Sequence, residues 1–102
     1  MSVIGTLSDD KTTYTISVSG DFNFSLLHQF KAAYRDVDGL ENKNIVIDLA
    51  NAKTVDSSAL GMLLAIKKDL NKNTQDISLI NSNEVIGKIL KITSFHNMFN
   101  IN

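Results

Sequence analysis

The stretch from residue 45 to residue 70 constrains the fold of this chain more than any other part of the sequence. Its apolar run Ile45-Val46-Ile47, followed by Asp48-Leu49, is rich in β-branched residues and predicts a buried strand. The polar segment 51–55 predicts a loop. Asp56-Ser57-Ser58 then precedes an apolar run with helical spacing. Asp and Ser favour helix N-termini because their side-chain oxygens accept hydrogen bonds from free backbone N–H groups. The stretch therefore predicts a strand, a loop and a helix, with two hydroxyl groups where the helix begins.

The remaining segments alternate between strand and helix patterns. Residues 2–7 and 13–19 predict two strands that form a hairpin across a turn at 8–11. Ser25 is the expected cap of a following helix through residue 34, and the spacing of Asn81 and Glu84 predicts the cap of a later helix. Residues 76–80 and 98–101 predict further short strands. The order predicts an α/β fold: one small domain over residues 1–102, with a mixed, mainly parallel sheet of four to five strands covered by helices.

Composition excludes several classes of protein. The chain has 102 residues, which is enough for one domain, and a net charge of -1, which predicts no contact with nucleic acid or a membrane surface. It contains no cysteine, so disulfides and thiolate metal sites are excluded and the reducing cytoplasm is the expected compartment. The N-terminus shows no signal-peptide pattern, and no apolar run approaches the ~20 residues that a membrane-spanning helix needs.

Polar side chains follow the predicted strands at several points. Asp21, Asn23, Asp48, Asp56 and Ser57 all come at or after the end of a predicted strand. Function tends to lie beyond the carboxyl ends of strands in α/β sheets. We therefore expect these five residues to share one edge of the sheet.

The central stretch resembles the signature of STAS domains, in particular the bacterial anti-sigma factor antagonists. The family pattern is an apolar strand ending in Asp-Leu, a short loop, and Asp-Ser-Ser followed by a small residue, Leu and Gly. Here it reads Asp48-Leu49 and Asp56-Ser57-Ser58-Ala59-Leu60-Gly61. The turn at 19–23 and the segment 81–101 resemble further parts of the family. Asn23 departs from the Asp that many members have, and Ala59 replaces a common Gly.

The resemblance implies a phosphorylation switch rather than an enzyme, and it implies no cofactor. The acceptor carried over from the family is Ser57, with Ser58 as the second choice. The implied kinase is also the anti-sigma factor and is a histidine-kinase-like ATPase; a metal-dependent, PP2C-like phosphatase reverses the modification. The unphosphorylated antagonist binds the kinase and so regulates transcription or an output such as stress response or biofilm formation.

The partner-binding surface is expected to include the start of the helix and part of its length. We expect Leu60, Leu63 and Leu64 to be core, whereas Met62 and Ile66 either face the partner or belong to a broader buried face. The predicted partner-binding residues are Asp21, Asn23, Asp56, Ser57, Ser58, Met62 and Ile66.

Other interpretations remain open at this point. The two serines could serve only as a helix cap, and the domain could be an unphosphorylated STAS scaffold subunit of a lipid or anion transport complex. Asp48 alone resembles the acceptor of a receiver domain, but the acidic pair of that fold is missing. A hydrolase would need a base beside Ser57, and the Gly-x-Ser-x-Gly motif is absent. His28 and His96 are too few for a metal site and are expected to be surface or structural residues.

Overall fold

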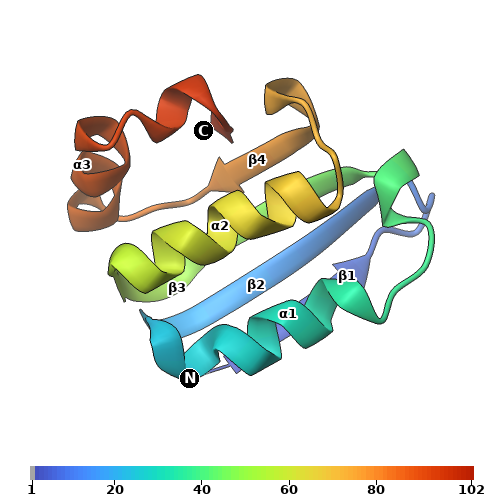
Figure 1. Cartoon of the computed structure of the whole chain (residues 1–102), viewed down its shortest axis with the longest axis horizontal. Coiled ribbons are helices and arrows are strands. Elements are labelled where there is room, and N and C mark those ends of the chain that lie inside the picture. The colour runs from blue at the N-terminus through green and yellow to red at the C-terminus, as the bar shows by residue number, and fades with distance from the viewer. Residues whose placement is uncertain (1) are drawn as a thin grey trace.

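The computed structural model describes residues 2–102, which form a five-stranded sheet with two of the three α-helices packed side by side on one face (Figure 1). The strands lie side by side in chain order, and β1 is antiparallel to β2 while all other neighbours are parallel. The strands are β1 (Ser2–Leu7), β2 (Thr13–Phe22), β3 (Asn44–Val55), β4 (Ile77–Ile80) and β5 (Asn100–Ile101). The helices are α1 (Leu27–Arg35), α2 (Ser57–Asp69) and α3 (Glu84–Ile92). The predicted α/β fold with a mixed, mainly parallel sheet is confirmed.

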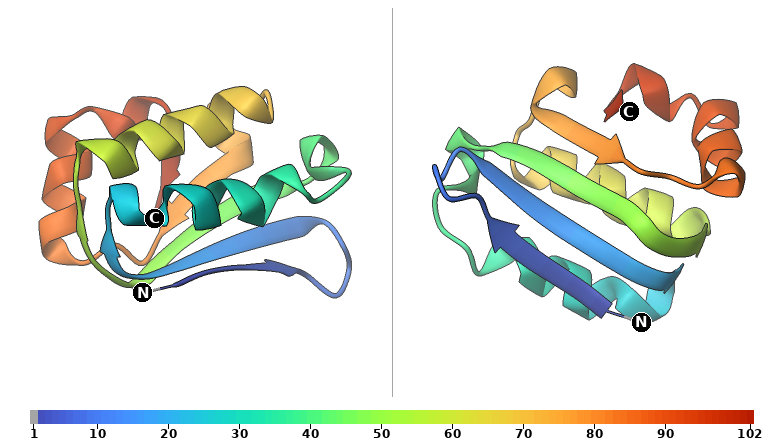
Figure 2. Two further views of the ribbon diagram at one scale, coloured as in Figure 1. Left: turned by 60° about the horizontal axis from the view of Figure 1, so that its bottom comes forward. Right: turned by 180° about the vertical axis from the view of Figure 1, so that it is seen from behind.

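The core lies between the sheet and the layer formed by α1 and α2, as Figure 2 shows from the side. Side chains alternate between the two faces of a strand, so every second residue of β2 and β3 points to this layer. These residues are buried, whereas their neighbours on the opposite face are partly exposed: Tyr14, Ile16, Val18, Ile45, Ile47 and Leu49 against Thr13, Thr15, Ser17, Val46 and Asp48. The sheet therefore has one apolar face covered by helices and one open, largely polar face.

The predicted hairpin between β1 and β2 is confirmed, and one glycine in it lies close against a tyrosine side chain. Asp10 holds the turn by accepting hydrogen bonds from the Ser8 hydroxyl and the Thr12 amide. Gly5 lies against Tyr14, and a Cβ on Gly5 would come within 1.8 Å of the Tyr14 hydroxyl oxygen. That hydroxyl donates to the Ala33 carbonyl of α1, so the hairpin is tied to the helix layer.

The predicted loop at 51–55 is wrong, because β3 continues through it to Val55. The last residues of β2, Ser19–Phe22, pair with Asn51–Val55 across two register shifts. The sequence looks loop-like because most of its side chains are polar and exposed. Backbone pairing with the neighbouring strand, which a local pattern does not contain, extends both strands.

Both predicted helix caps lie two residues from the observed ones. The cap before α1 is Asn23 rather than Ser25. Its side-chain oxygen accepts a hydrogen bond from the Ser25 amide at 2.9 Å and caps the short turn that precedes α1. Asn83, and not Asn81, caps α3 by accepting the Ile86 amide at 2.8 Å. Asn23 caps only the turn Phe24–Leu26, and α1 itself begins after Leu26 without a side-chain cap. The position of a cap depends on where the preceding chain turns.

The part of the chain that the structure describes contains no helix with the length and apolar character needed to cross a bilayer.

Candidate functional site

Four of the five predicted edge residues meet where β2 and β3 end. Phe22 pairs with Val55, and the Asp56 amide donates to the Phe22 carbonyl at 3.4 Å. One residue earlier, the Thr54 hydroxyl donates to the Asp21 carboxylate at 3.2 Å. The parallel register therefore brings Asp21 and Asn23 of one chain segment beside Asp56 and Ser57 of the other.

Asp56 and Ser57 have different roles at the start of α2. Asp56 has extended backbone and is the N-cap; its carboxylate accepts the Ala59 amide at 2.9 Å. Ser57 is the first residue of the helix and is exposed, whereas Ser58 is partly buried. The first amides of a helix have no partner within the helix, so the surroundings of Ser57 favour an added negative charge.

Asp48 lies elsewhere, and its expected place at this edge is wrong. It sits in the middle of β3 on the open face of the sheet, paired in register with Ser17 and Ile80. Its carboxylate accepts the Ala50 amide at 3.0 Å and the Asn81 side-chain amide at 3.1 Å. Asp48 therefore joins β3 to the segment that follows β4. The misplacement follows from the unexpected length of β3.

The partner-facing orientation considered for Ile66 is also wrong, whereas Met62 borders the space between α1 and α2. Met62 is 4% exposed and Ile66 is fully buried, whereas Leu64, predicted to be core, is 40% exposed. Leu63 is buried as expected and Leu60 is partly buried. Apolar residues cover most of α2, so spacing alone did not identify which side faces the sheet.

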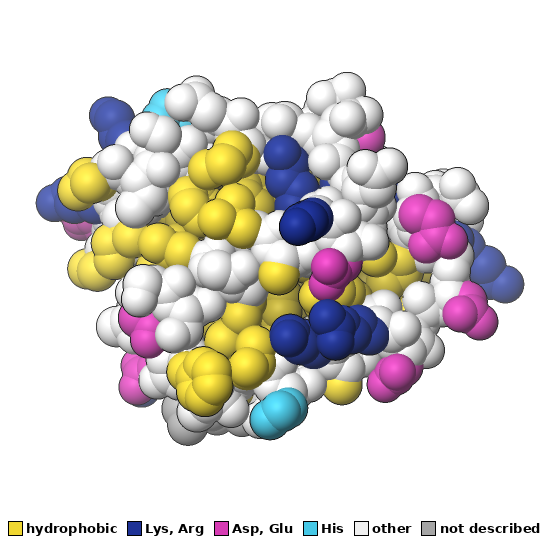
Figure 3. Space-filling model, in the orientation of Figure 1, with side chains coloured by type: hydrophobic (Ala, Val, Ile, Leu, Met, Phe, Trp, Pro, Cys, Tyr) yellow, Lys and Arg dark blue, Asp and Glu magenta, His cyan; other side chains and the backbone are white. Residues whose placement is uncertain are grey.

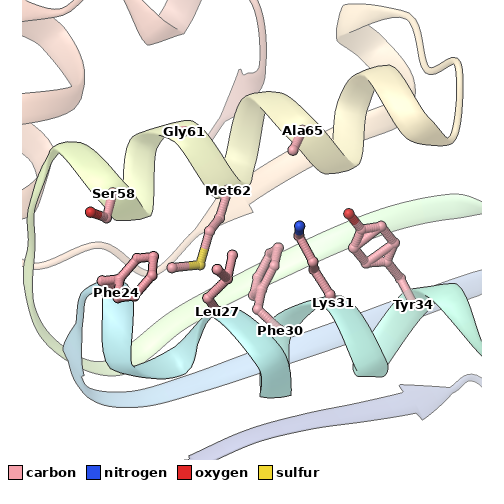
Figure 4. Close-up of a pocket in the computed structure, with 9 residues that line it drawn as sticks. All are labelled: Phe24, Leu27, Phe30, Lys31, Tyr34, Ser58, Gly61, Met62 and Ala65. Carbon is pink, nitrogen blue, oxygen red and sulfur yellow. The ribbon is translucent and has the colours of Figure 1, made fainter.

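A groove of about 290 Å³ runs between α1 and α2 and begins beside the candidate acceptor (Figure 4). Its lining is mostly apolar and comes from both helices and the turn before α1: Phe24, Leu27, Phe30, Lys31, Tyr34, Ser58, Gly61, Met62 and Ala65. Ser58 is thus part of the groove and Ser57 lies one residue outside it.

The far end of the groove is closed by a polar contact between the helices. The Tyr34 hydroxyl donates to the Asp69 carboxylate at 2.7 Å, and Arg35 lies 3.7 Å from the same oxygen. The pKa of Tyr34 is raised to about 12, mainly because its hydroxyl is buried and secondly because of the hydrogen bond to Asp69. Tyr34 therefore remains neutral at physiological pH and acts as a fixed donor that holds α1 against α2.

Residues 6–100 match the family model described as the MlaB STAS domain. The chain belongs to the STAS domain family. A STAS-domain containing protein of Pseudomonas aeruginosa is 37% identical over 101 residues, which cover 99% of each chain. The anti-sigma-B factor antagonist of Staphylococcus aureus is 23% identical, with 97% of this chain and 91% of that protein covered. The structure of a candidate anti-sigma factor antagonist from Thermotoga maritima superposes with a TM-score of 0.80 at 22% identity, covering 97% of this chain and 84% of that one.

This STAS domain offers little that could hold a metal. His28 is exposed on α1, and His96 is exposed in the short turn Phe95–Asn97. Among residues 2–102, no three His, Cys, Asp or Glu side chains gather in a way that could hold a metal ion. The chemical groups that the site does present are an accessible hydroxyl, carboxylates and an apolar groove.

Most lining residues of the groove of this STAS domain were not predicted as partner-binding residues; of the lining, only Ser58 and Met62 were. Phe24 is 66% exposed, Lys31 reaches into the groove from α1, and Gly61 leaves its wall open on α2. A signal was present in the spacing of Phe24, Leu27, Lys31 and Tyr34, which defines a second stripe beside the buried one. Because the stripe includes a lysine, it does not stand out as an apolar face.

Proposed function

We propose that this STAS domain is an anti-sigma factor antagonist that acts as a non-catalytic, cytoplasmic partner switch. In its unphosphorylated form it binds an anti-sigma factor that is also its serine kinase. The observation that carries the proposal is the exposed Ser57 hydroxyl at the first residue of α2, directly after the cap Asp56. The full-length likeness to the anti-sigma-B factor antagonist of Staphylococcus aureus supports it.

Ser57 is a better acceptor than Ser58 because of its exposure. A kinase must bring its nucleotide within bonding distance of the hydroxyl oxygen, which requires open space around it. Ser57 has that space, whereas Ser58 is partly buried against the groove. Asp21 and Asp56 lie on the same edge and complete the docking surface together with Asn23.

Phosphorylation would act on docking and leave the fold unchanged. A phosphate adds about -1.5 to -2 charges, and the N-terminus of a helix stabilises such a charge locally. Asp56, and more weakly Asp21, would oppose it by like-charge repulsion. A partner that packs on this edge would have to remove water from the added charge. A loss of about 2.7 kcal/mol already weakens binding a hundredfold.

The partners follow from this role. The kinase is of the histidine-kinase-like ATPase type, and a PP2C-like serine phosphatase returns the antagonist to its binding form. Release of a sigma factor then changes transcription, with stress response or biofilm formation as outputs.

The test is mass spectrometry of the native protein, combined with partner binding by two variants. We expect phosphate on Ser57; Ser57→Ala should bind the co-purifying kinase and Ser57→Asp should not. Ser58→Ala is the matched control and should keep both phosphorylation and binding. Absence of phosphate under all growth conditions, with both Ser57 variants still bound to a transport complex, would replace this function with that of a STAS scaffold subunit.

A further inference from the structure

The groove between α1 and α2 is apolar at one end and cationic at the other. Figure 4 shows Phe24, Leu27 and Met62 converging beside Ser58, with the Lys31 ammonium group further along, near Tyr34. Phe24 is 66% exposed, which is a large exposure for a phenylalanine that adjoins further apolar surface. Exposed apolar surface with a polar rim is typical of a site for a protein partner.

The two helices that border the groove are positively charged, whereas the chain as a whole is not. The chain has a net charge of -1, yet α1 and α2 carry four cationic side chains and one acidic one. In Figure 3, lysine and arginine side chains gather over the middle of this face, next to exposed apolar surface. Asp69, the one acidic residue of the two helices, is already engaged by Tyr34 and Arg35.

Lys31 is the cationic residue whose position allows an ion pair with an acidic group of a partner. It lines the groove and is partly buried, and within residues 2–102 it forms no ion pair of 4.0 Å or less. An ammonium group in apolar surroundings attracts a carboxylate more strongly than one in bulk water. The groove thus matches an anionic group placed next to an apolar one.

We infer that the groove receives an acidic amphipathic segment of the protein partner, with an apolar side chain seated by Phe24 and Met62 and a carboxylate paired with Lys31. This inference deepens the proposed function, because it names the chemistry of the partner at the same surface. The apolar side chain supplies affinity and the carboxylate supplies orientation.

The arrangement also couples docking to the switch. Ser58 lines the groove and Ser57 precedes it, so a phosphate on Ser57 would stand at the end where the acidic segment enters. Like charges would then meet at the entrance. Partner release by phosphorylation would depend on salt concentration, since ions screen this repulsion.

The test replaces Phe24 with a photo-reactive benzoylphenylalanine in the full chain, expressed in its native cells. The matched control carries the same residue at Val85, an exposed apolar position on α3 away from the groove. After irradiation, mass spectrometry identifies the cross-linked peptide. We expect an adduct at position 24 and not at 85, and a cross-linked peptide with Asp or Glu within about one helical turn of the attachment.

Three further variants then establish whether the groove itself is occupied. Gly61→Leu should lower the adduct yield at least tenfold by filling the groove, and it should fold, because a Cβ at this position meets nothing within 4 Å. Lys31→Met should lower the yield about fivefold, the loss of roughly one partly buried ion pair. Lys68→Met removes a charge outside the groove lining and should leave the yield unchanged.

Several results would overturn the inference. They are an adduct yield at position 24 no higher than at 85, a cross-linked peptide without an acidic residue, an adduct with a second copy of the chain, or a yield that Gly61→Leu does not change. Carrying out the cross-linking in a Ser57→Ala background makes the outcome independent of phosphorylation. Adduct in this background, with no phosphate on Ser57 of the native protein, contradicts the proposed switch alone, and lack of adduct in this background contradicts the groove alone.

Discussion

Replacing Gly61 by Ala should make this protein more stable. Gly61 is the fifth residue of the 13-residue helix α2, where glycine costs about 1 kcal/mol relative to alanine. A Cβ there has no other heavy atom within 4 Å outside its immediate surroundings, so the new methyl group causes no clash. We therefore expect a gain of about 1 kcal/mol in the free energy of unfolding. For a domain of this size that corresponds to a rise in Tm of about 4 °C.

Alanine substitutions at two other glycines are the controls for this measurement. Gly87→Ala in α3 should give a similar gain, because its Cβ would lie 3.7 Å from the Ser82 hydroxyl, an ordinary contact. Gly5→Ala should destabilise the protein, because its Cβ would overlap the Tyr14 hydroxyl at 1.8 Å. Urea denaturation followed by circular dichroism measures all three.

The reasoning is refuted if Gly61→Ala unfolds at the same or a lower urea concentration than the wild type while Gly87→Ala behaves as expected. That result would mean that the wall of the groove at Gly61 is closed in solution. If the gain is observed, weaker partner binding by the same variant would indicate that glycine is present for access rather than for stability.

Three further outcomes are expected. Asp56→Ala removes the cap of α2 and should lower the free energy of unfolding by about 1 kcal/mol in urea denaturation, and Asp56→Asn, which can still accept the Ala59 amide, should recover most of the loss. Tyr34 has a folded pKa of about 12 against an ordinary value of 10.0, so its contribution is complete below pH 10 and is lost as the pH rises towards 12. Titration of unfolding between pH 8 and 12 should show a steeper decline for the wild type than for Tyr34→Phe, and parallel curves would contradict the role of the bond to Asp69. Phosphorylated Ser57 should leave the circular dichroism spectrum unchanged and confine NMR shift changes to the start of α2 and its neighbours, whereas changes throughout the sheet would show that the switch is conformational.

Local patterns identified most elements of the fold. Period-two alternation at 13–19 indicated β2, because a strand with one buried face alternates apolar and polar side chains. The run of β-branched apolar residues at 45–49 indicated β3. Turn residues at 8–11 marked the hairpin. Asp56-Ser57 marked the start of α2, because capping is a contact between neighbours in the chain.

Elements that depend on distant partners were not recovered in this way. The carboxyl half of β3 is polar and exposed, and it is a strand because β2 runs beside it. The same extension moved Asp48 from the expected edge to the middle of the open face. Long-range backbone pairing decides strand length, and a short sequence window contains no information about the neighbouring strand.

The sequence by itself predicted the kind of domain from the order of its local patterns. It also predicted the candidate acceptor, from a motif whose capping contact spans only three residues of chain. Only the tertiary structure decided which side of α2 is core and which is surface, since Leu64, Met62 and Ile66 are all apolar and differ only in what packs on them. It alone also placed Lys31 of α1 and Gly61 of α2 in the lining of one groove. Such a surface comes from two helices that are separated in the sequence, and its shape depends on how both rest on the same sheet.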